Sequence, residues 1–131
     1  MLTEYIDVNR KWGIILCHDL HPLDEYEMRQ IMMAFGMRGQ RIERAIDTVL
    51  YHRNTGMCIS RDDIRMSLIF IGNATSDDQW WDTLAHELLD HAKVAISEYY
   101  YVPWKSEDSA WLTGYLISKA VQLFGTPCYM E

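Results

Sequence analysis

The sequence has no long hydrophobic segment, few prolines and cysteines, and no excess of basic residues. Its apolar runs, such as those at 14–17 and 68–71, are far shorter than the roughly 20 residues that cross a membrane as a helix. The acidic, polar start of the chain predicts no secretory signal. We therefore expect a cytoplasmic protein without a membrane partner.

The three cysteines, Cys17, Cys58 and Cys128, are an odd number without close spacing, which predicts reduced thiols. A net charge of −7, from 19 acidic and 12 basic residues, opposes binding to nucleic-acid phosphates. With 5 tryptophans, 8 tyrosines and only 3 prolines, the composition is not that of a disordered chain. Its 131 residues suffice for one core, so we expect a single domain over 1–131.

Hydrophobic periodicity and capping residues predict eight elements, beginning with an N-terminal hairpin. They are strands at 3–8 and 12–17, helices at 22–36 and 40–51, strands at 57–60 and 65–72, and helices from 76 to at least 95 and from 106 to 124. The order ββααββαα predicts an α+β fold with a small antiparallel sheet packed against helices.

A histidine and a glutamate are adjacent in the third predicted helix, in the stretch His86-Glu87-Leu-Leu-Asp90-His91. Such a pair begins the zincin motif H-E-x-x-H, in which two imidazoles four residues apart bind Zn²⁺ and the glutamate activates a water. Four residues turn an α-helix by about 400°, so Asp90 faces nearly the same way as His86. His91 points about 140° away in an undistorted helix. Asp90 is therefore the favoured second ligand, and His91 is the alternative if a distortion such as a π-bulge rotates it.

The same residues have a plainer explanation, because His86, Asp90 and Lys93 centre the hydrophilic face of an amphipathic helix. In this interpretation they are ordinary solvated side chains, and Lys93 would repel a cation unless it turns away. The buried face would then consist of Trp81, Leu84, Ala85, Leu88, Ala92, Ala95 and Tyr99.

Four segments of the second half follow one another in a recognisable order. They are a strand at 66–72 ending in Ile-Gly, a Thr/Ser-rich helix start at 73–78, His86-Glu87, and Glu107-Asp-Ser-Ala-Trp-Leu-Thr-Gly114. With this pattern, residues 54–124 resemble small zincin-like proteins of bacteriophages and gut Bacteroidetes. The resemblance implies a gluzincin-type site that binds Zn²⁺ or another divalent metal. It makes His86 the first ligand, Glu87 the general base and Glu107 the third ligand. The sequence departs from the family in having Asp90 in place of the second histidine.

A metal site shared by His86 and Glu107 places a condition on the fold. If the third helix ran to Glu98 it would carry the chain some 12 Å beyond Asp90, and Glu107 would lie too far away. A common site needs a shorter helix or a connection at 99–105 that folds back. Glu107 is equally explained as an acid in the first turn of a helix.

The resemblance implies a zinc-dependent, metallopeptidase-like protein, phage-encoded and acting in a bacterial host, in which metal-activated water hydrolyses an amide bond. The strand Ser67–Ile71 would hold an extended peptide or protein substrate by main-chain hydrogen bonds. The alternative is a catalytically inactive zincin-fold module that binds a partner protein, for which the aromatic segment 99–104 is the candidate surface.

Overall fold

The structure, a computed structural model, describes residues 1–125, so that Cys128 lies outside the described part of the chain. Its strands are β1 (Leu2–Val8), β2 (Trp12–His18), β3 (Gly56–Arg61) and β4 (Met66–Ile71). Its helical elements are the 3₁₀ turn η1 (Pro22–Asp24), α1 (Glu25–Ala34), α2 (Gln40–Tyr51), α3 (Asp77–Ala85), the π-helix η2 (His86–Ala92), α4 (Lys93–Tyr100) and α5 (Glu107–Phe124). The predicted order ββααββαα and the mixture of helices with one sheet are confirmed.

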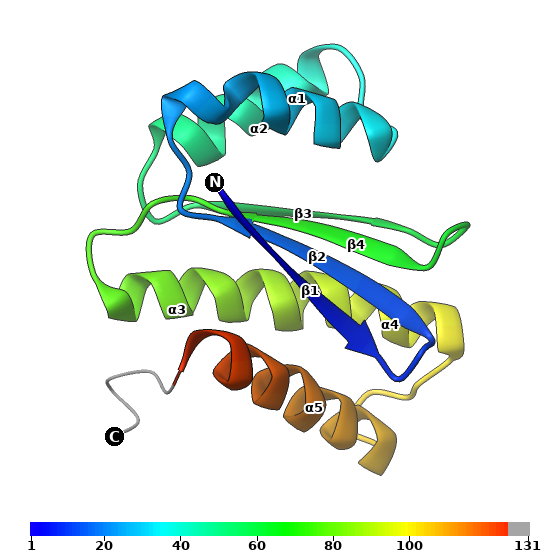
Figure 1. The fold of residues 1–131 in the computed structure, drawn as a ribbon. Helices are drawn as coiled ribbons and strands as arrows, with labels where there is room; N and C mark the ends of the chain where they lie inside the picture. The colour runs from blue at the N-terminus through cyan, green and yellow to red at the C-terminus, as the bar shows by residue number, and fades with distance from the viewer. Residues whose placement is uncertain (126–131) are drawn as a thin grey trace.

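The elements form three layers, with the sheet in the middle (Figure 1). Helices α1 and α2 cover one face, and the other face is covered by α5 together with the long helix that runs through α3, η2 and α4. None of the helices within residues 1–125 is long and apolar enough to cross a membrane.

The two central strands, β2 and β4, supply both cores because their side chains point alternately to opposite faces. Trp12, Ile14 and Leu16 pack toward α3 and α5, whereas Cys17 packs toward α1 and α2. In β4, Ile69 and Ile71 join the first core and Leu68 and Phe70 the second. Both strands are therefore apolar along almost their whole length, as expected for strands buried on both faces.

The sheet is mixed, which corrects the prediction of an antiparallel sheet. Its order is β1-β2-β4-β3, and β2 pairs with β4 in parallel, with Ile15 opposite Leu68. A parallel pair needs a long crossover, which here consists of α1, α2 and β3. The β3–β4 hairpin then places β3 at the edge and β4 in the interior.

A candidate metal centre in a π-helix

The long helix under the sheet begins at Asp77, where the Ser76 hydroxyl accepts a hydrogen bond from the Gln79 amide at 3.2 Å. It changes from α- to π-helix at His86 and returns to α-helix at Lys93. At the end of the π-helix, the Lys93 amide donates to the carbonyl of Leu88, five residues earlier. Because π-helical hydrogen bonds join residues five apart, residues i and i+5 come close to the same side of the helix.

The π-helix brings His91 to His86. Their Nε2 atoms are hydrogen-bonded to each other at 3.2 Å, and the two rings meet edge to face at 83° with centroids 4.9 Å apart. Two nitrogens bound to one tetrahedral zinc, each at about 2.0–2.1 Å, would be separated by about 3.3 Å. The spacing of the two imidazole nitrogens therefore matches that of two ligands of one metal ion.

Asp90, the favoured second ligand from the sequence, contacts the opposite side of the His86 ring. The Nδ1–H of His86 donates to Oδ2 of Asp90 at 3.0 Å. An ionised carboxylate only accepts hydrogen bonds, so this contact places the proton on Nδ1 and leaves a lone pair on Nε2. Metal-binding histidines are commonly held in this way by a carboxylate on their other nitrogen.

Glu87 completes a group with His86 and His91 in which one ligand atom from each residue lies within 4.8 Å of the others. Glu87 is only 5% exposed, whereas the side chain of His86 is 57% exposed. Burial raises the pKa of Glu87, while the neighbouring His91 and His86 oppose that rise. The group thus joins two accessible imidazoles to a carboxyl group whose affinity for protons is increased.

The edge strand fixes the position of Glu87. A Cβ on Gly56 would lie 3.0 Å from Cγ of Glu87 and 2.9 Å from Cγ2 of Thr83, so only glycine lets β3 approach the helix this closely. A cavity of about 380 Å³ opens beside the contact and is lined by His86, Glu87, Thr83 and Gly56, among others. The candidate centre therefore faces a space adjacent to the edge of the sheet.

Glu107, the third ligand implied by the resemblance, is not brought to this group. The long helix continues to Tyr100, about 20 Å beyond His86 along its axis, and α5 begins near this far end (Figure 1). Glu107 is the exposed first residue of α5. Among residues 1–125, the group that can hold a metal consists of His86, Glu87 and His91.

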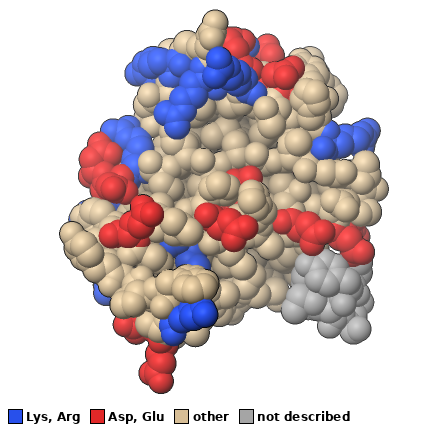
Figure 2. Space-filling model, turned by 180° about the vertical axis from the view of Figure 1, so that it is seen from behind, with Lys and Arg blue, Asp and Glu red and all other residues tan. Residues whose placement is uncertain are grey.

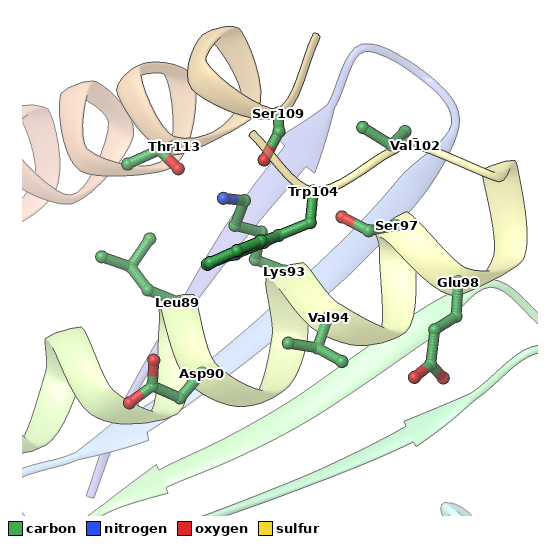
Figure 3. Close-up of a pocket in the computed structure, with 10 residues that line it drawn as sticks. All are labelled: Leu89, Asp90, Lys93, Val94, Ser97, Glu98, Val102, Trp104, Ser109 and Thr113. Atoms are coloured by element: carbon green, nitrogen blue, oxygen red, sulfur yellow. The ribbon is translucent and has the colours of Figure 1, made fainter. Parts of the chain in front are cut away.

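The charges around the centre favour a cation. On the rear face of the molecule, acidic side chains form a band across the middle, while Lys and Arg gather mainly above it (Figure 2). The long helix itself carries five exposed acids: Asp77, Asp78, Asp82, Asp90 and Glu98. Its basic residue, Lys93, directs its ammonium group toward α5 and away from the Asp90 carboxylate (Figure 3).

Comparison with known proteins adds no relative: no protein-family model, no curated protein and no solved structure matches this chain.

Proposed function

We propose that this protein is a zinc-dependent, metallopeptidase-like hydrolase in which His86 and His91 bind the metal and Glu87 is the general base. The observation that carries the proposal is the 3.2 Å separation of the two Nε2 atoms. Imidazole nitrogens are ligands that suit zinc. A metal ion bound there would supply Lewis acidity toward an amide carbonyl and an attacking water.

The protein side chains would divide the remaining tasks among them. Asp90 holds the His86 ring in the tautomer that presents Nε2. Glu87 is buried beside the two imidazoles, and its raised pKa suits a group that takes a proton from water and returns it to the leaving amine. The cavity beside Gly56 offers room for a substrate carbonyl.

The strand expected to hold an extended substrate, Ser67–Ile71, cannot do so because β4 is paired on both sides. Of the two edge strands, β1 and β3, β3 is the one that packs against η2. The Gly72 amide donates to the Thr55 carbonyl at 2.7 Å. In the antiparallel β3–β4 ladder, every second residue of β3 counted from Thr55 therefore directs its main-chain groups toward β4. The main-chain groups of Gly56, Cys58 and Ser60 therefore point outward. A peptide that pairs with them would lie alongside η2, against which β3 packs.

A metal-independent interaction module is the second candidate, and the exposed aromatic side chains favour it. Tyr101 and Trp104, in the connection between α4 and α5, are 90% and 81% exposed. Large exposed aromatic side chains are typical of protein-binding surfaces. This candidate requires no metal at His86.

Elemental analysis of the purified protein after zinc loading and desalting distinguishes the two candidates. We expect about one zinc per chain, lost in both His86→Ala and His91→Ala. His52→Ala is the matched control, since His52 also contacts an acid, Asp47, at 3.3 Å but has no second histidine beside it. Absence of zinc from the wild type, or equal zinc in all four proteins, would refute the proposed metal centre.

Hydrolysis needs a separate test with a peptide library and the zinc-loaded protein. We expect cleavage by the wild type and its loss in Glu87→Gln, which keeps the shape of the side chain but cannot take a proton. Identical product patterns from the two proteins would remove Glu87 as the base.

A further inference from the structure

A groove of about 470 Å³ lies between the long helix and the start of α5, next to the candidate metal centre (Figure 3). Its apolar walls are Leu89, Val94 and Val102, and the indole of Trp104 lies across it. Lys105 lies over the same indole, with its ammonium 4.6 Å from the ring centroid. The volume is within the range of pockets that hold small organic ligands.

The positive and negative side chains that line this groove point to opposite sides of it. Lys93 directs its ammonium toward α5, where the hydroxyl groups of Ser109 and Thr113 point into the same space (Figure 3). The carboxylates of Asp90 and Glu98 point to the opposite side, away from α5 (Figure 3). Within residues 1–125, no ion pair involves Lys93. The α5 side of the groove is therefore a positive, hydroxyl-lined end without an anion.

A buried hydroxyl adds to this set. Ser97 lines the groove, and its Oγ is buried without a hydrogen-bond partner in the described part of the chain. A buried hydroxyl without a partner is unfavourable, so a ligand atom that accepts its proton would relieve the cost of its desolvation. An ammonium group and hydroxyl donors together form a typical receptor for a carboxylate.

We propose that this groove binds the carboxyl-terminal residue of a peptide, with the free carboxylate at Lys93 and an apolar side chain against Trp104. The proposal rests on the proposed function for what the peptide is, namely the substrate. Asp90 lines the groove and also holds His86, so the rest of the peptide leads from the groove toward the candidate metal centre. The site would thus select substrates by their C-terminus.

Binding of single-residue probes to chelator-treated protein tests the groove independently of metal and of cleavage. The probes are N-acetyl-L-phenylalanine and its primary amide, which differ in charge but share the aromatic side chain. We follow the indole N–H signal of Trp104 and the backbone amides of Ser97 and Thr113 by NMR titration. We expect the acid to shift all three signals and to bind at least tenfold more tightly than the amide.

Two variants and one competitor complete the experiment. Lys93→Met should weaken binding of the acid at least tenfold and leave the amide unchanged, whereas Lys119→Met, which removes a charge elsewhere on α5, should change neither. Trp104→Ala, at an exposed position, should weaken both probes. Three results would overturn the proposal. They are equal affinity for the acid and the amide, wild-type affinity for the acid in Lys93→Met, and binding of inorganic phosphate as tight as that of the acid. Because these titrations use no metal, their failure would leave the zinc measurements standing.

Discussion

The imidazoles of His86 and His91, five positions apart in the sequence, lie with their Nε2 atoms 3.2 Å apart because the helix between them is a π-helix. An α-helix would point the two rings about 140° apart. The backbone distortion and the candidate metal centre are therefore one feature. Local departures from α-helix of this kind are frequent at functional sites.

The contact between Asp90 and His86 predicts a graded effect on metal affinity. Asp90→Ala should weaken zinc binding about 10–100-fold, because the His86 ring loses the carboxylate that fixes its tautomer and orientation. His91→Ala should abolish stoichiometric binding. Competition with a chromophoric chelator measures both affinities. If Asp90→Ala were as damaging as His91→Ala, Asp90 would itself be a ligand.

Glu87 predicts a pH dependence of stability in the metal-free protein. Because burial raises its pKa above about 4.5, the folded protein holds this proton to higher pH than the unfolded chain. The free energy of unfolding should therefore fall as the pH rises from the unfolded-state pKa through the folded-state pKa. Glu87→Gln should lack this fall. Urea denaturation with chelator between pH 4 and pH 7 compares the two proteins, and parallel curves would contradict the prediction.

The close approach of β3 to the helix predicts that Gly56→Ala is destabilising. The new methyl group would meet Thr83, Glu87 and the Phe70 carbonyl at 2.9–3.1 Å, a misfit that costs about 1–3 kcal/mol. Gly114→Ala is the matched control, since a Cβ in the middle of α5 meets nothing within 4 Å. It should stabilise the protein by about 0.5–1 kcal/mol. Thermal unfolding of both variants tests whether the two substitutions change stability in opposite directions.

The two described cysteines should be poorly reactive in the folded protein. Burial raises the pKa of Cys17 to about 11 and that of Cys58 to about 12, so little thiolate exists at pH 8. In a Cys128→Ser variant, reaction with a disulfide reagent should be about two orders of magnitude slower than that of a free thiol. Addition of denaturant should release two reactive thiols. Fast reaction in the native state would show that the strands open readily.

Local patterns were enough to predict the elements and several of their boundaries. The helices predicted from 76 and from 106 are capped by Ser76 and Ser106, and the alternation in 12–17 predicted the strand there correctly. The parallel pairing of β2 with β4 was missed because it depends on how far-separated strands meet, which alternation does not encode. The prediction of an antiparallel sheet was wrong for this reason.

For the site, the sequence identified candidate residues but not how they lie relative to one another. His86 and Glu87 were singled out, and His91 was an alternative that needed a helix distortion, which the structure contains. The spacing of apolar residues could not reveal the π-helix, since Leu88 and Ala92 are buried at an ordinary four-residue interval. The burial of Glu87 and the distance to Glu107 depend on how β3 and α5 pack, and no local signal reports that packing.

The wider turn of the π-helix between His86 and Ala92 accommodates one more residue than a turn of α-helix would. Deleting Asp90 would join Leu89 to His91 and leave His-Glu-Leu-Leu-His. A regular α-helix places two histidines at this spacing on the same side without any bulge. The shortened chain would still present both rings to one ion but would lose the acid that steadies the first. The π-helix thus lets a five-residue spacing, with Asp90 between the two halves, do what a four-residue spacing does in a regular α-helix.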